Sequence, residues 1–276
     1  MSATSTRGTT SGTTLGTTSG TAAAPASRPR LRTSTAVRAY LAVELRRSLR
    51  NRRTLIFSMV MPPVLFLIFG LQGDYQDQST GHGNVTAWIA VSMALYGAMV
   101  TATGGGASVS VERAQGWTRQ LRLTPLRPAV YVAVKLAGSM VLGAASVLLT
   151  LVVAAFTGAQ MAAGAWVLCA VLAWVGSLVF AAFGLFMGYL LPAENVMQIL
   201  GPLLALLSFA GGLFVPLGDG WWATVAQFFP TYGLAELVHA PLGGDLGVTA
   251  VVNVLAWAAI FFVGAAWRFR KDTARA

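Results

Sequence analysis

Six apolar runs, each close to the length needed to cross a bilayer, constrain this sequence more than any other feature. A helix needs about 20 predominantly apolar residues to cross the hydrocarbon core of a membrane. The runs cover residues 55–71, 88–111, 130–156, 166–191, 196–215 and 248–267. The sequence therefore predicts an all-α integral membrane protein whose residues 54–267 form six transmembrane helices.

Two local features refine the predicted spans. The first run contains Pro62-Pro63, which should kink its helix, and it is short for a span. Glycines at 104–106 and the spacing of Gly184 and Gly188 would allow neighbouring helices to approach closely.

The distribution of the basic residues predicts how the spans are oriented. All 19 Lys and Arg residues fall into three clusters: ten from Arg7 to Arg53, five from Arg113 to Lys135 and four from Arg268 to Arg275. Basic residues stay on the cytoplasmic side of a membrane, most clearly in short loops next to spans. We therefore expect both termini, including the basic tail 268–276, in the cytoplasm. A plasma-membrane protein is predicted, and 17 Arg against 2 Lys suits a bacterial source.

The N-terminal region divides into two parts. Residues 1–34 are rich in Ser, Thr, Gly and Ala, so they are predicted to be disordered. Residues 35–53 predict an amphipathic helix in the inner headgroup layer, with an apolar stripe of Val37, Leu41, Leu45 and Leu49. The predicted anchors to the membrane interface are Arg46, Arg47, Arg50, Arg52 and Arg53. Basic residues flank membrane-length segments rather than lining one face, which favours lipid headgroups over nucleic acid as their partner.

Several kinds of chemistry have no support in the sequence. There is no Walker A phosphate loop, so the chain is not expected to bind a nucleotide or to be an enzyme. His82 and His239 both fall in predicted external loops, where we expect them to be solvated, and no metal-binding spacing is present. No catalytic residue or metal ligand is predicted. Lys135, just inside the third run, is expected to snorkel to the inner interface.

The cytoplasmic loop at 112–129 carries an order of residue types that a simple basic loop does not explain. It reads ERAQGWTRQLRLTPLRP, with apolar and basic positions that predict a short helix up to about Leu123. Pro125 disfavours helical geometry at Thr124 and would end this helix.

This loop resembles that of the type-2 ABC transporter permeases, a family that includes drug and polysaccharide exporters. The resemblance rests on Glu-Arg, then Gly, then a Leu-rich turn ending in Thr-Pro, although Trp117 stands where a small hydroxyl residue is frequent. It extends to Pro62-Pro63 in the first span and to the region from Phe214 to Gly244. In that family the latter region forms short external re-entrant helices before the last span.

The resemblance implies a membrane subunit that works with a separate ABC ATP-binding subunit, which would bind ATP and Mg²⁺. A second permease copy or a paralogue would complete a dimer, and this chain itself would hold no cofactor. The substrate exported from the cell would be amphipathic or hydrophobic: a drug, a lipid or a lipid-linked glycan. The residues implied in coupling to the ATPase are Glu112, Arg113, Gly116, Trp117, Arg119, Leu121, Arg122, Thr124 and Pro125.

Three alternatives are weaker. An ABC importer permease would carry a Glu-Ala-Ala then Gly pattern in its cytoplasmic loop, which is missing here. An ion-coupled secondary transporter usually has ionisable residues in mid-membrane, and the centres of the six runs have none. An integral membrane enzyme would need a nucleophile and a base placed together in the membrane, which the sequence does not predict.

Overall fold

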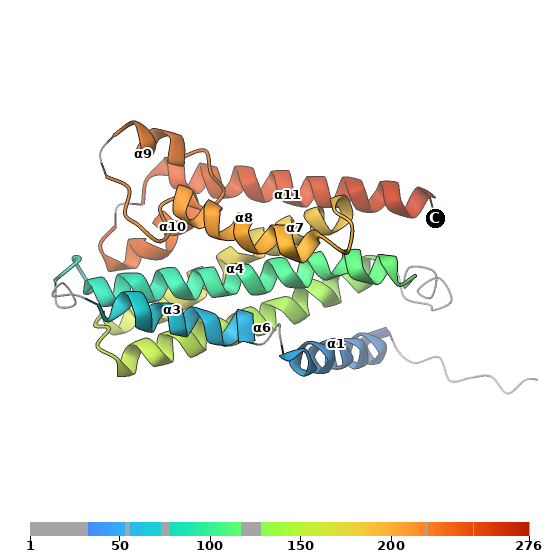
Figure 1. Cartoon of the computed structure of the whole chain (residues 1–276), viewed down its shortest axis with the longest axis horizontal. Helices are drawn as coiled ribbons and strands as arrows, with labels where there is room; N and C mark the ends of the chain where they lie inside the picture. The colour runs from blue at the N-terminus through green and yellow to red at the C-terminus, as the bar shows by residue number, and fades with distance from the viewer. Residues whose placement is uncertain are drawn as a thin grey trace, which may run out of the picture.

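The computed structural model describes residues 33–52, 56–72, 78–116, 128–218, 220–244 and 246–275, and these form a helical bundle (Figure 1). The helices are α1 (Thr33–Arg50), the π-helix η1 (Ile56–Val60), α3 (Met61–Gly70), α4 (Val85–Ala114), α6 (Pro128–Phe156), α7 (Ala163–Leu190), α8 (Val196–Ala210), α9 (Trp221–Ala226), α10 (Tyr232–His239), the 3-10 helix η2 (Ala240–Leu242) and α11 (Val248–Arg275). The predicted all-α class is confirmed for these residues. The tail predicted to be disordered lies outside them, apart from Thr33 and Ser34, which begin α1.

Among the described residues, four helices are long and apolar enough to cross a membrane: Val85–Ala114, Ala129–Phe156, Ala163–Leu190 and Val248–Asp272. They confirm four of the six predicted spans. The other two predicted spans fall on shorter apolar helices, Ser58–Gly70 and Val196–Ala210. Six crossings therefore stay a prediction.

The Pro62-Pro63 pair acts at the start of a helix rather than in its middle. Both prolines lie in the first turn of α3, and the preceding turn is the π-helix η1. Proline has no N–H to donate and its ring clashes with the carbonyl four residues back. A wider π-turn before the pair relieves that clash, so the predicted kink takes the form of a junction between two helical segments.

Helix α4 forms the centre of the bundle. It packs against α7 and α6 along its length and also against α3 and α8 (Figure 1). In its most apolar stretch 72% of the residues are buried, against 22% in α11. Because α4 touches most other helices, a shift at either of its ends is felt across the bundle.

Glycines make the contact between α4 and α7 close, as the sequence predicts. A Cβ atom on Gly184 would overlap the backbone of Thr103, and one on Gly106 would overlap the backbone of Ala181. Gly188 likewise lies against Ala107. Gly104 differs from its neighbours, because a Cβ there would meet nothing within 4 Å. The close approach fixes the position of α4 against α7.

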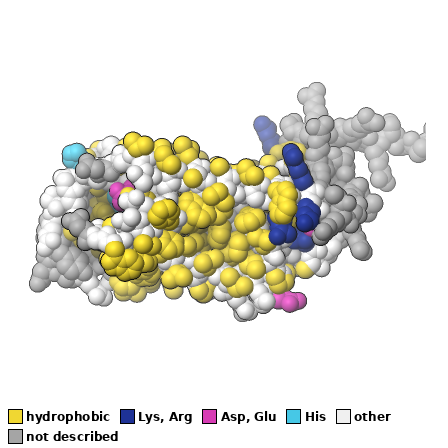
Figure 2. Space-filling model, turned by 90° about the horizontal axis from the view of Figure 1, so that it is seen from above, with side chains coloured by type: hydrophobic (Ala, Val, Ile, Leu, Met, Phe, Trp, Pro, Cys, Tyr) yellow, Lys and Arg dark blue, Asp and Glu magenta, His cyan; other side chains and the backbone are white. Residues whose placement is uncertain are grey.

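The two ends of the bundle differ in charge. Figure 2 shows a wide apolar surface with the Lys and Arg side chains gathered at one end, which we call the basic end. It contains the C-terminal ends of α4 and α11, the start of α6, and α1. The opposite end contains residues 78–84, 157–162 and 239–244. A broad apolar surface between two polar ends fits a bundle embedded in lipid.

Loops at the opposite end are joined by backbone hydrogen bonds. His82 N–H donates to the carbonyl of Leu242 (2.9 Å), and the N–H of Ala162 donates to the carbonyl of His82 (3.3 Å). Asn84 caps α4 by accepting from the N–H of Ala87 (2.9 Å) and also binds Gly158 and Gln160. The short helices expected before the last span are present as α9 and α10, at this end.

Candidate functional site

Glu112, in the last turn of α4, is more buried than Arg113, the other charged residue of the predicted coupling set that the structure describes. It is only 2% exposed. A carboxylate removed from water is costly unless positive charges and hydrogen bonds compensate it. The groups around Glu112 must therefore compensate its buried negative charge.

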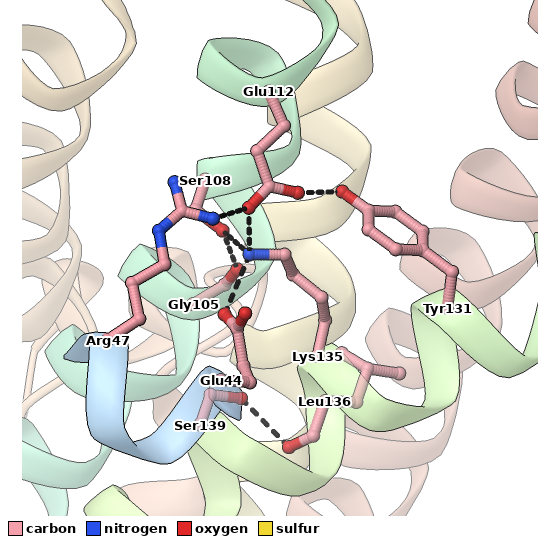
Figure 3. Close-up of polar contacts among 9 residues, drawn as sticks. All are labelled: Glu44, Arg47, Gly105, Ser108, Glu112, Tyr131, Lys135, Leu136 and Ser139. Atoms are coloured by element: carbon pink, nitrogen blue, oxygen red, sulfur yellow. Dashed lines mark hydrogen bonds and ion pairs between the residues drawn. The ribbon is translucent and has the colours of Figure 1, made fainter. Parts of the chain in front are cut away.

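Three side chains from two other helices surround Glu112 (Figure 3). Arg47 of α1 places Nη1 2.6 Å from Oε1, and Lys135 of α6 places Nζ 2.5 Å from the same oxygen. The hydroxyl of Tyr131, also on α6, donates to Oε2. Glu112 thus joins α1, α4 and α6 directly before the 112–129 loop.

Lys135 connects this carboxylate to a second one. Its Nζ lies 2.8 Å from Oε1 of Glu44 on α1 and donates to Ser108 of α4 at 2.9 Å. The expected snorkelling of Lys135 is wrong: it is 3% exposed, because α1 packs over it. We call Glu44, Arg47, Glu112, Tyr131 and Lys135 the Glu112 cluster. Its two cations and two carboxylates balance formally.

Helix α1 is amphipathic, and three residues of the predicted apolar stripe, Val37, Leu41 and Leu45, are partly buried. The inward side is centred on Glu44, which is 8% exposed, whereas Leu49 is 51% exposed. Tyr40, on the same inward side, stacks on Tyr131 with ring centroids 6.3 Å apart. The ion pair between Glu44 and Lys135 adds to this apolar contact in holding α1 on α6.

Arg113 makes its contacts on another side of α4. Its Nη2 lies 2.6 Å from Oδ1 of Asp272 on α11, and its guanidinium lies 5.4 Å from the ring centroid of Tyr189 on α7. It also donates to the carbonyl of Tyr189 at 3.4 Å. Two adjacent residues, Glu112 and Arg113, therefore tie the end of α4 to four other helices.

Of the remaining predicted coupling residues, Gly116 is the one that lies within the described part of the chain. Gly116 follows α4 with φ +73°, a backbone conformation that favours glycine, and its N–H donates to the carbonyl of Arg113 (3.0 Å). It makes the turn that leads into the loop. The others lie outside the described residues: Trp117, Arg119, Leu121, Arg122, Thr124 and Pro125.

The predicted interface anchors do not behave alike. Arg46, Arg50 and Arg52 are exposed, as an anchoring role requires, and Arg53 lies outside the described residues. Arg47 is half-exposed and belongs to the Glu112 cluster.

Sequence reasoning missed Glu44, Tyr131, Lys135 and Asp272 as site residues. A signal was present for two of them. Lys135 stands inside an apolar run and Glu44 stands among the apolar residues of the amphipathic helix. Ionisable residues in such positions are functional or paired by default, because burying them alone is costly. Asp272 offered no such signal in a basic tail.

The expectation of two solvated histidines holds for His82, which is exposed, but is wrong for His239. His239, at the end of α10, is 8% exposed; its Nε2 lies 2.9 Å from Oγ of Ser92, and its ring stacks on Trp88 at 4.1 Å. Burial lowers the pKa of His239 to about 3, so the ring is neutral near pH 7. Ser92 is fully buried and also donates to the carbonyl of Trp88. The contact therefore docks α10 on α4.

Comparison with known proteins gives the family. The family model described as ABC-2 type transporter matches residues 35–242, more than half of the 276 residues. A protein of Bacillus subtilis (strain 168) named "Putative transport permease YvfS" is 25% identical over 246 residues, which cover 84% of this chain and 96% of that protein. The chain belongs to the ABC-2 type transporter family. It is a multi-pass membrane transport permease, and permeases of this family work with ATP-binding subunits.

Proposed function

We propose that this ABC-2 permease is the membrane-spanning subunit of an ATP-driven exporter, and that a separate ATPase drives it through the 112–129 loop. The observation that carries the proposal is the arrangement of Glu112 and Arg113. They are the first two residues of the 112–129 segment, still in the last turn of the central helix, and between them contact α1, α6, α7 and α11. A force on the loop would reach most of the bundle through these two residues.

Glu112 would act as a positioning residue, because its carboxylate is too buried to touch a partner. The contact with the ATPase would fall to the residues after Gly116, with Arg119 and Arg122 supplying charge. Binding and hydrolysis of ATP with Mg²⁺ would occur in the partner. The partner's different contacts with two conformations of the permease would supply the free energy that shifts one into the other.

Ion pairs are suited to a contact between helices that must rearrange during transport. Arg47 and Lys135 both contact Oε1 of Glu112, so either can move while the carboxylate keeps a cation. Charge–charge attraction depends less on angle than a hydrogen bond between neutral groups does. The Glu112 cluster could therefore rearrange without leaving a buried charge unpaired.

The proposed topology has six crossings with both termini in the cytoplasm of a bacterial cell. The gathering of the described basic side chains at one end supports it, because positive residues mark the cytoplasmic face. In this topology α3 and α8 are the two short crossings, and α9 and α10 form a re-entrant pair on the outer side. Two copies, or one copy and a paralogue, would line the pathway.

The exposed helix faces are apolar, which favours an amphipathic or hydrophobic substrate such as a drug, a lipid or a lipid-linked glycan. A second candidate is an ion-coupled secondary transporter. Lys135 between two carboxylates is the observation that favours it, since buried ionisable groups often carry protons in transporters. These groups lie at the basic end rather than midway along the spans, which weighs against this candidate.

Reconstituted vesicles separate the two functions. The full chain is inserted alone or with a candidate ABC ATP-binding subunit, and movement of a fluorescent amphipathic substrate is followed with ATP or with a proton or sodium gradient. We expect transport only with the ATPase and ATP. Gradient-driven transport by the chain alone would overturn the proposal in favour of the secondary transporter.

A further inference from the structure

The side of α1 that faces away from the bundle carries a hollow with an unusual lining. Val43, Arg46, Arg47 and Arg50 line an open hollow of about 310 Å³ on the helix surface. Their spacing of three, four and seven residues places them on one helix face. Val43 is 61% exposed, and Leu49, beyond Arg46 on the helix surface, is 51% exposed. The hollow itself is lined mainly by carbon atoms, and the helix face around it combines guanidinium groups with exposed apolar side chains.

Positive charge on this face is not balanced within the described part of the chain. Arg46 and Arg50 are exposed, and no carboxylate of the described residues lies within ion-pair distance of either. The third guanidinium, that of Arg47, is held by Glu112. A ligand for this face should carry negative charge and an apolar part.

We propose that this face binds the phosphate of an anionic phospholipid, and that Arg47 is shared between that phosphate and Glu112. Guanidinium groups match phosphate oxygens in geometry and charge. An amphipathic helix with arginines beside apolar residues binds at the headgroup level of anionic membranes. The acyl region would cover Val43 and Leu49, which a free phosphate ion would leave in water.

Sharing of Arg47 links lipid binding to the Glu112 cluster. If Arg47 turns toward a lipid phosphate, Glu112 still holds Lys135 and Tyr131, so the cost to the cluster is one ion pair. The contact between α1 and the end of α4 becomes looser. Its consequence for transport rests on the proposed coupling role of the 112–129 loop, but lipid binding itself does not.

The test uses the purified full chain in detergent, without an ATPase. Phosphatidylglycerol, phosphatidylcholine and inorganic phosphate are the probes, and bound lipid is counted by native mass spectrometry. The variant R46Q/R50Q is compared with R38Q/K271Q, which removes the same charge from exposed positions of α1 and α11 outside the hollow. Thermal unfolding confirms that both variants are folded.

We expect the wild-type chain to retain phosphatidylglycerol over phosphatidylcholine. R46Q/R50Q should bind it about thirty-fold more weakly, at about 1 kcal/mol for each arginine, while R38Q/K271Q binds it nearly as the wild type does. Equal losses in both variants, equal binding of the two lipids, or displacement by inorganic phosphate at the same concentration would each overturn the site.

Hydrogen–deuterium exchange tests the sharing of Arg47. Phosphatidylglycerol should speed amide exchange in the last turn of α4 in the wild type, and not in R46Q/R50Q. If the chain binds phosphatidylglycerol but amide exchange in α4 does not change, the proposed sharing of Arg47 is wrong. The proposed lipid site on α1 would not be affected by that result. Because no step measures ATP-driven transport, failure here is distinct from failure of the proposed function.

Discussion

At the basic end of the bundle, charged side chains hold α1, α4 and α6 together, whereas at the opposite end amide, hydroxyl and backbone groups join α4, α7, α10 and α11. The basic end has buried Glu112 and Lys135 as its centre. The opposite end has buried Asn84, Asn253 and His239. The two ends pair these buried groups by different interactions, and at the basic end Nε of Arg268 is buried without a hydrogen-bond partner among the described residues.

The difference indicates which end can change its contacts. Asn253 uses both amide atoms on fixed backbone groups of residues 227–233, so movement there breaks directional hydrogen bonds. At the basic end, Glu112 has two cations on one oxygen, so one cation can move to another anion while the second stays on the carboxylate. We infer a rigid opposite end and an adaptable basic end, and the following predictions test that contrast.

The largest effect is expected from Lys135→Met. It leaves Glu44 and Glu112 buried with only Arg47 as counter-charge, and breaking a buried ion pair from one side costs about 3–5 kcal/mol. The free energy of unfolding in detergent, measured with a denaturant series, should fall by about that amount. Adding Glu44→Gln to Lys135→Met should recover part of the loss, because it removes one unpaired carboxylate.

Arg50→Met is the matched control, since it removes an exposed cation with no described carboxylate partner. Its effect should stay below about 0.5 kcal/mol. Equal losses from Lys135→Met and Arg50→Met would show that the Glu112 cluster contributes nothing specific to the basic end.

At the opposite end, Asn253→Leu should cost about 2–3 kcal/mol. The substitution leaves the carbonyls of Gln227 and Phe229 and the N–H of Gly233 without their side-chain partner. Amide exchange in α10 should rise together with the loss of stability. Val252→Leu, at an exposed neighbouring position, serves as control and should change neither quantity.

The pH dependence of the opposite end should come from His239. Its pKa is lowered to about 3 by burial, while an unfolded histidine titrates near 6.5. Between these values the unfolded chain binds the additional proton, so stability rises with pH across this window and is lost as pH falls below about 6.5. At pH 5.5 the loss should be about 1.4 kcal/mol.

Unfolding of the wild type and of His239→Gln over pH 4.5–7.5 checks this prediction. The wild type should lose stability relative to His239→Gln as the pH falls through 6.5. Parallel curves for the two proteins would contradict a buried, neutral His239, and with it the docking of α10 on α4.

The sequence predicted features that depend on local composition better than contacts between residues far apart in the chain. Apolar runs and glycine spacings predicted the long helices and the close approach of Gly106 and Gly184, because both follow from local composition. The segregated charges predicted a basic end. The Glu112 cluster could not be predicted, since Glu44, Glu112 and Lys135 are far apart in sequence and meet only when α1 packs on α6. The burial of His239 was missed for the same reason, because its partner Ser92 on α4 lies far from it in the sequence.

The smallest effect on stability is expected from the Arg113–Asp272 pair, and it separates structure from coupling most clearly. Both side chains are about one-third exposed, and such pairs contribute about 1 kcal/mol or less. Arg113→Ala, Asp272→Ala and the double variant should therefore unfold within about 1 kcal/mol of the wild type. ATP-driven transport per folded protein should nevertheless fall, because the link from the end of α4 to α11 is lost.

The double variant decides whether the link acts as a pair. If Arg113 couples through Asp272, the double variant should transport as poorly as either single variant and no worse. Arg38→Ala, at an exposed position of α1 outside the Glu112 cluster, should leave transport unchanged. Additive losses would instead assign Arg113 and Asp272 to separate contacts, and normal transport in all three variants would remove Arg113 from the coupling site. The adaptable end of the molecule would then consist of the Glu112 cluster alone.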